Sequence, residues 1–118
     1  MDPTYAQIAE AFSRHQFAQA YPYLARDVRW VLVGGPTLVG ADAAIAACEG
    51  TLAGLGETTT HFTKFKTVAD ETAVVVDSVA EYVDADGTVT VASCDLYDFS
   101  GDGLVVEITS YTVEIPGG

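Results

Sequence analysis

One aspartate in the C-terminal half of the chain, Asp95, stands where a charged group is costly. Read as every second residue of a β-strand, its companions on one face are mostly apolar: Val89, Val91, Ser93, Tyr97 and Phe99. An ionised carboxylate buried without a partner is so unfavourable that the group either gains hydrogen bonds or keeps its proton. A neutral carboxyl group can donate a hydrogen bond to an oxygen that gains negative charge in a reaction. We therefore expect Asp95 to be a catalytic acid; the alternative is a structural carboxyl group satisfied by a neighbouring Tyr, Ser or backbone group.

A histidine on another predicted strand, His61, is the next candidate. Strand alternation puts His61 and Phe65 on one face and Lys64 and Lys66 on the other, so we expect the imidazole to point toward the interior. Histidine is the side chain best suited to move protons near neutral pH. The alternative is a histidine that is hydrogen-bonded at a pocket wall or strand edge.

Apolar and aromatic residues from several predicted elements would line such a site. Tyr97 lies two residues from Asp95 on the same face and is best placed to add a catalytic hydroxyl. Trp30 could add an indole N–H donor. The residues that we expect to contact a ligand are Ile8, Phe12, Trp30, Leu32, Phe65, Tyr82 and Tyr111. For Trp30 and the tyrosines, the alternative is a side chain that only fills the core.

Neither a metal site nor a phosphate site is predicted. His15 and His61 are far apart in the pattern, and no carboxylate pairs with either at ligand spacing. His15 lies at the end of a predicted helix, where a solvated cation is the ordinary explanation. Gly34 and Gly35 lead into another extended stretch and not into a helix, so they do not form a phosphate loop. We expect no metal and no cofactor.

The charge of the chain restricts its partners. Seventeen acidic residues and five basic ones give a net charge of -12, without a cluster of Lys or Arg. This balance repels nucleic acid and anionic membrane surfaces, so neither is an expected partner. A neutral, hydrophobic small molecule is the expected ligand.

The sequence contains neither a leader-like start nor an apolar run long enough to span a bilayer. We therefore expect a soluble, cytoplasmic protein. Cys48 and Cys94 lack the spacing of a metal motif or a disulfide framework, and we expect both to be small buried residues. A disulfide between them stays open.

Three helices are predicted in the first half of a single domain that spans residues 1–118. The first has Asp2 as its N-cap and Pro3 at its first position, and runs to Arg14 or His15. The second covers residues 17–24, interrupted by Pro22. The third covers residues 43–55. A strand over residues 27–33 separates the last two.

The second half predicts consecutive hairpins, with strands over residues 59–68, 72–83, 88–99 and 104–115. Helices followed by hairpins favour an α+β fold in which a curved antiparallel sheet wraps around three N-terminal helices. Both faces of these strands are rich in apolar or small residues. Since one face covers the helices, we expect a second copy to cover the other, as a homodimer packed through the sheet.

This order of elements, with an apolar cone between helices and sheet, resembles the nuclear transport factor 2-like superfamily, a cystatin-like α+β roll that includes ketosteroid isomerase and SnoaL-type polyketide cyclases. The similarity covers nearly the whole chain. Its most specific part is Asp95-Leu96-Tyr97-Asp98-Phe99, the turn through Gly103, and residues 105–111, which align with ketosteroid isomerase without a gap. The resemblance implies that Asp95 corresponds to the aspartic acid that donates a hydrogen bond to the enolate oxygen.

Other family positions differ. The isomerase's proton-transferring carboxylate falls on Leu32, its oxyanion tyrosine on Ile8, and the acid of many cyclases near the last strand on about Val113. The prediction is an acid/base isomerase or cyclase that acts on a hydrophobic carbonyl or polycyclic compound. The alternative is a noncatalytic ligand-binding or dimerisation module. Epoxide hydrolysis would require an Asp-Arg-Asp arrangement in the cone, whereas Arg29 is predicted to face outward.

Overall fold

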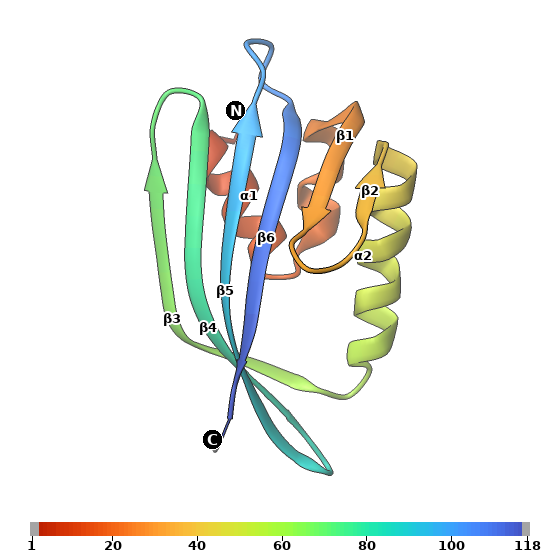
Figure 1. Cartoon of the computed structure of the whole chain (residues 1–118), viewed down its shortest axis with the longest axis vertical. Helices are drawn as coiled ribbons and strands as arrows, with labels where there is room; N and C mark the ends of the chain where they lie inside the picture. The colour runs from red at the N-terminus through yellow and green to blue at the C-terminus, as the bar shows by residue number, and fades with distance from the viewer. Residues whose placement is uncertain (1–2, 117–118) are drawn as a thin grey trace.

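The structure, a computed structural model, describes residues 3–116 and is an α+β fold built on one sheet of six strands (Figure 1). The strands are β1 (Leu24–Leu32), β2 (Thr37–Val39), β3 (Thr59–Ala69), β4 (Ala73–Asp84), β5 (Gly87–Phe99) and β6 (Val105–Ile115). Their order across the sheet is β2-β1-β6-β5-β4-β3. β1 and β6 are parallel, and the other neighbours are antiparallel. The two α-helices are α1 (Tyr5–Ser13) and α2 (Ala41–Leu55), with α1 against β3, β4 and β5 and α2 against β1 and β2.

The sequence predicted three helices, and two α-helices are present among the described residues. α1 begins after Thr4, whose side chain accepts from the backbone of Gln7 while the Gln7 side chain accepts from the backbone of Thr4. The helix therefore has Thr4 as its N-cap. The predicted N-cap, Asp2, lies outside the described residues. The predicted second helix is wrong, because Phe17–Gln19 and Tyr21–Tyr23 form two separate 3₁₀ turns. Pro22 lacks the N–H that an α-helix would need.

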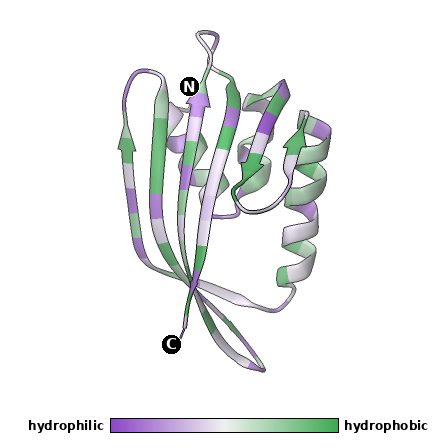
Figure 2. Ribbon diagram, viewed as in Figure 1, coloured by the Kyte–Doolittle hydropathy of each residue, from purple (hydrophilic) through white to green (hydrophobic). Residues whose placement is uncertain are grey.

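The four long strands are confirmed to within one or two residues at each end. β1 begins earlier than predicted. Its first two residues, Leu24 and Ala25, are both buried, so the alternation that predicted the rest of the strand does not extend to them. The pairing of β1 with β6 shifts in register between Leu24 and Arg29. Figure 2 shows hydrophobic and hydrophilic residues alternating along β3, whereas β4 begins with the unbroken hydrophobic run Ala73–Val76, so both of its faces carry apolar side chains.

An irregularity in β3 reverses the faces predicted for the residues before it, whereas Lys64, Phe65 and Lys66 after it lie on the faces that the sequence predicts. The pairing with β4 shifts in register between Phe62 and Lys64, so the strand has one extra residue there. Phe62 consequently faces inward and is half-buried, while His61 is exposed. The inward orientation predicted for His61 is therefore wrong.

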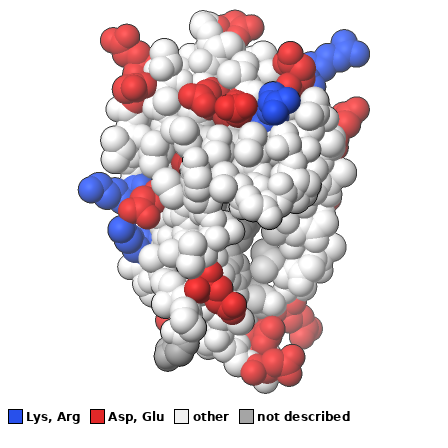
Figure 3. Space-filling model, viewed as in Figure 1, with Lys and Arg blue, Asp and Glu red and all other residues white. Residues whose placement is uncertain are grey.

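The core fills the space between α1, α2 and the inner face of the sheet. Its fully buried members include Ala9, Val28, Ala44, Val74, Val76, Val105 and Ile108. The outer face also carries exposed apolar side chains, among them Val68, Tyr111 and Val113. Acidic side chains gather toward the two ends of the molecule in the view of Figure 3, whose centre is largely uncharged.

Within residues 3–116 no helix combines the length and hydrophobicity that crossing a bilayer requires. Cys48 and Cys94 are both free thiols. Cys48 is fully buried as predicted, whereas Cys94 is only half-buried, because it lies on the strand face opposite to Asp95.

Candidate functional site

A cavity of about 270 Å³ lies between the end of α1 and the inner face of the sheet. Its aromatic wall consists of Phe12, Phe17, Trp30, Phe62 and Tyr82. Its polar groups are Ser13, His15, Thr51, Ser78, Ser93, Asp95, Ser110 and Thr112. The cavity thus combines aromatic and aliphatic wall residues with eight side chains that can form hydrogen bonds, and ligand sites in proteins likewise combine an apolar wall with polar groups.

Asp95 is half-buried in this wall and accepts a hydrogen bond of 2.9 Å from the hydroxyl of Ser13 to its Oδ2. Burial raises the pKa of Asp95 above its ordinary value. Hydrogen bonds from Ser110 and Ser13 and the nearby His15 offset part of that rise in pKa. The predicted position of Asp95 on an apolar, inward face is therefore confirmed.

One short chain of hydrogen bonds ends at this carboxyl group, and a second ends at the neighbouring Ser110. The hydroxyl of the fully buried Tyr97 lies 2.6 Å from Ser13 Oγ, and because the single proton of Ser13 goes to Asp95, Tyr97 must donate to Ser13. Burial raises the pKa of Tyr97 well above its ordinary value, so the phenol keeps that proton. In the second chain, Trp30 Nε1 donates to Ser110 Oγ at 3.0 Å, which leaves the Ser110 proton free for Asp95. Tyr97 thus lies behind the cavity wall and reaches the site through Ser13.

His15 also lines the cavity, although the sequence predicts a solvated side chain at this position. It follows α1 with a φ of 66°, and its ring centroid lies 5.5 Å from that of Phe17 and 6.0 Å from that of Tyr82. Burial lowers the pKa of His15 below its ordinary value, an effect that the nearby Asp95 partly offsets. The prediction of a solvated cation is wrong.

The turn after α1 explains this placement. The backbone N–H of His15 donates to the Phe12 carbonyl at 3.1 Å and that of Gln16 to the Ala11 carbonyl at 2.8 Å, the paired bonds of a Schellman motif. In this motif the residue after the C-cap turns back in the left-handed region, which directs the His15 side chain into the cavity. Helical periodicity carries no signal for such a turn, and the usual signal, a glycine, is absent.

The other predicted site residues divide into two groups. Trp30, Leu32, Phe12 and Tyr82 line the cavity, as expected for ligand contacts. The second group does not line it, and consists of His61, Ile8, Phe65, Tyr97 and Tyr111.

Each exception has a physical reason. His61 is turned outward by the irregularity in β3, and Tyr111 is 49% exposed because it pairs with Cys94 on the outer face. Ile8 is buried in the core on another side of α1. Phe65 packs against the core while the guanidinium of Arg14 lies 4.0 Å from its ring centroid.

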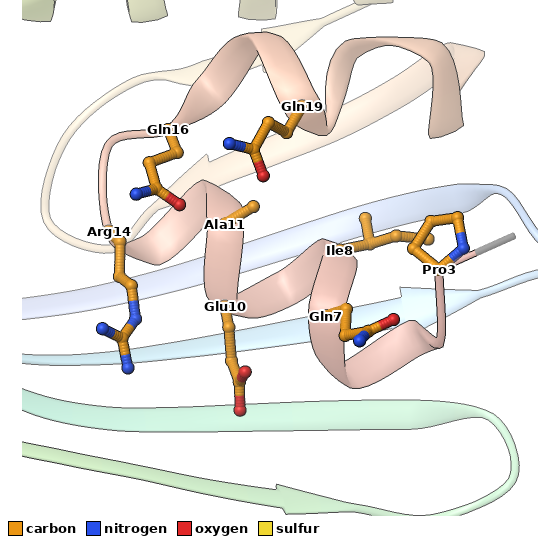
Figure 4. A pocket seen from close by; sticks show the side chains of 8 residues that line it. All are labelled: Pro3, Gln7, Ile8, Glu10, Ala11, Arg14, Gln16 and Gln19. Atoms are coloured by element: carbon orange, nitrogen blue, oxygen red, sulfur yellow. The ribbon is translucent and has the colours of Figure 1, made fainter. Parts of the chain in front are cut away.

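A second, more open hollow of about 620 Å³ lies along α1 and the turn that follows it (Figure 4). Its charged groups are already engaged: Glu10 accepts from the Thr67 hydroxyl at 2.6 Å, and Arg14 covers Phe65. Within residues 3–116 no cluster of three or more His, Cys, Asp or Glu side chains could hold a metal ion. The cavity around Asp95 is therefore the stronger candidate for a site.

Comparisons with known proteins identify the fold and the family. An NTF2-like protein of unknown function from Cytophaga hutchinsonii is 25% identical, with a TM-score of 0.78 over 90% of this chain and 93% of that one. A putative polyketide cyclase from Xanthomonas campestris is 23% identical, with a TM-score of 0.69 over 88% and 83% of the two chains. An LEH-like epoxide hydrolase from M. tuberculosis is 18% identical, with a TM-score of 0.69 over 92% and 81% of the two chains.

No curated protein matches the sequence. The SnoaL-like domain family matches residues 5–108, nearly the whole chain. The chain therefore belongs to the SnoaL-like domain family, which has the nuclear transport factor 2-like fold.

Proposed function

We propose that this protein is a cofactor-independent acid/base enzyme that isomerises or cyclises a small hydrophobic carbonyl compound, with Asp95 as the buried acid. The observation that carries the proposal is the environment of Asp95: an aromatic-walled cavity in which burial favours the protonated carboxyl group. Family membership supports it, because relatives of the same fold are named putative polyketide cyclases.

The proposed chemistry follows from the different roles of the two carboxyl oxygens of Asp95. Oδ2 accepts from Ser13, so a proton on the other oxygen can be donated to a carbonyl oxygen in the cavity. When a proton leaves the carbon next to that carbonyl, negative charge develops on the oxygen. A hydrogen bond from a carboxylic acid in a site with little water stabilises that charge.

The size and charge of the site narrow the ligand. A volume of about 270 Å³ is slightly below the range of about 300–1,000 Å³ that is usual for ligand pockets, which favours a compound of one or two rings over a larger polycyclic one. The net charge of -12 and the absence of Lys or Arg among the cavity-lining residues favour a neutral ligand.

Epoxide hydrolysis fits less well, although an epoxide hydrolase shares the fold. The Asp-Arg-Asp arrangement would require an arginine in the cavity. Arg29 lies on the outer face of β1 and forms an ion pair with Glu107, with 3.5 Å between Nε and Oε1.

The experiment uses 2-naphthol, a two-ring phenol that imitates an enolate. We expect the protein to bind 2-naphthol, Asp95→Asn to weaken binding at least tenfold, and carbon NMR of the Asp95 carboxyl group to show a raised pKa. His61→Asn, at the exposed face of β3, is the matched control and should bind normally. An ordinary pKa together with no binding would favour the alternative, a noncatalytic ligand-binding or dimerisation module.

A further inference from the structure

The cavity lacks the carboxylate that would accept a proton from carbon, because Leu32 stands where the resemblance would place it. Among the lining residues, only Asp95 and His15 carry groups that exchange protons near neutral pH. From the position of His15 in the cavity, on a strained turn and beside Asp95, we infer that its imidazole accepts the proton from the substrate carbon. This inference rests on the proposed function and deepens it.

The first support is the backbone. His15 is the only non-glycine residue with a positive φ in the part of the chain that the structure describes. Glycine is the usual residue at this position of a Schellman motif, and most other residues meet a steric conflict there, although histidine adopts it more readily than most. A strained residue that lies in a cavity indicates a role that a relaxed residue would not fill.

The second support is how the ring is held. The imidazole is stacked on Tyr82 with 28° between the ring planes and lies 6.3 Å from Phe62, centroid to centroid. Aromatic neighbours on several elements restrict the ring to the cavity side of the turn. The adjacent Arg14 points elsewhere, onto Phe65, so no cation competes at the imidazole.

The third support is the protonation states of His15 and Asp95. The titratable groups that face His15 are Asp95 from β5 and Tyr82 from β4. Burial moves both members of the pair toward their uncharged forms, since the pKa of His15 is lowered and that of Asp95 is raised. A neutral imidazole can accept a proton and a neutral carboxyl group can donate one, so the two groups have complementary roles.

The step is balanced. The lone pair of an imidazole nitrogen takes the proton from the carbon next to the carbonyl. The electrons of that C–H bond form a C=C bond, and the π electrons of the carbonyl move to oxygen, which Asp95 hydrogen-bonds. In an isomerisation the substrate is a β,γ-unsaturated carbonyl compound, so deprotonation gives a dienolate; the imidazolium returns its proton to the γ-carbon, the β,γ double bond moves to α,β, and the carbonyl re-forms. In a cyclisation the enolate carbon attacks a second carbonyl, whose oxygen receives the proton.

The test measures deuterium exchange at the acidic carbons of 2-tetralone, a two-ring ketone, in D₂O by proton NMR. We expect the wild type to accelerate exchange, and His15→Asn and His15→Gly each to lose at least about a hundredfold of that acceleration. Both replacements suit the left-handed backbone, so the fold should be preserved. Added imidazole should partly restore exchange in the His15→Gly protein, an effect that a merely structural role would not produce.

The outcomes separate the inference from the proposed function. Wild-type exchange in both variants, or no exchange in a wild-type protein that binds 2-naphthol, would overturn the role of His15 and leave Asp95 as the acid. Both His15 variants should bind 2-naphthol more tightly than Asp95→Asn does, because the hydrogen bond to the phenol comes from Asp95. Absence of 2-naphthol binding in the wild type would instead refute the proposed function.

Discussion

The hydroxyl of Ser13 lies 2.9 Å from Oδ2 of Asp95, although the two residues are 82 positions apart in the chain. The bond joins the last residue of α1 to the middle of β5. Because Tyr97 donates to the same hydroxyl, Ser13 transmits a hydrogen bond from the core to the cavity. Ser13 therefore affects both stability and the acidity of Asp95.

Replacing Ser13 by Ala should cost about 1–3 kcal/mol of unfolding free energy, because it leaves the buried Tyr97 hydroxyl without its acceptor. Adding Tyr97→Phe removes that unpaired hydroxyl, so the double variant should lose less than the sum of the two single variants. Urea unfolding of the four proteins measures the difference. Ser93→Ala, at a cavity position, is the control; strict additivity would contradict the Tyr97–Ser13–Asp95 chain.

Asp95→Asn should change how stability depends on pH. Because the pKa of Asp95 is raised in the folded state, the folded protein holds this proton more tightly than the unfolded chain does. This contribution favours folding most at low pH and is lost as the pH rises through the folded pKa. In the wild type this contribution should lower the thermal midpoint as the pH rises from 4 to 8. We expect Asp95→Asn to remove that decline. An unchanged decline would show that other groups cause it.

His15→Asn should remove a pH dependence of stability that has the opposite sign. The pKa of His15 is lowered in the folded state, so its contribution is fully present above the unfolded value of 6.5 and is lost as the pH falls through the folded pKa. Thermal midpoints between pH 5 and 8 should therefore fall less steeply toward low pH in His15→Asn than in the wild type. A profile as steep in His15→Asn as in the wild type would show that other groups cause the fall.

Two neighbouring residues in β3 should respond differently to truncation. Phe62→Ala enlarges the cavity and should cost about 2–4 kcal/mol, near or below the usual cost of a core phenylalanine because Phe62 is only half-buried. His61→Ala should stay within about 0.5 kcal/mol of the wild type, as exposed positions do. Chemical denaturation compares the two, and a larger loss in His61→Ala would place the irregularity in β3 elsewhere.

We propose that a second copy of the chain covers the outer face of the sheet. Val113, 65% exposed, lies in a row with Val79 and Ala92 on this face. Val113→Glu should therefore shift a dimer toward the monomer in sedimentation equilibrium. Val39→Glu changes a similarly exposed valine, 60% exposed, on the short edge strand β2 and should have no effect. A wild-type protein that sediments as a monomer would exclude this interface.

The sequence predicted most of the sheet because hairpin turns and alternating residues are local signals. The same alternation identified Asp95, since β5 is regular from Gly87 to Asp98. It misplaced both histidines for related reasons. One extra residue in β3 turned His61 outward and Phe62 inward, and a left-handed residue after α1 turned His15 inward. Both are single-residue departures from regular geometry, which periodicity averages away.

Ser13 and His15 both come from the C-terminal end of α1, whereas Asp95 belongs to the sheet. A small rotation of this nine-residue helix would carry the hydroxyl and the imidazole away from the carboxyl group together. In the proposed mechanism, the alignment of Asp95 and His15 therefore depends on how α1 packs against the strands beneath it. Substitutions at this contact between α1 and the sheet are then expected to lower turnover, although Asp95 and His15 themselves are unchanged.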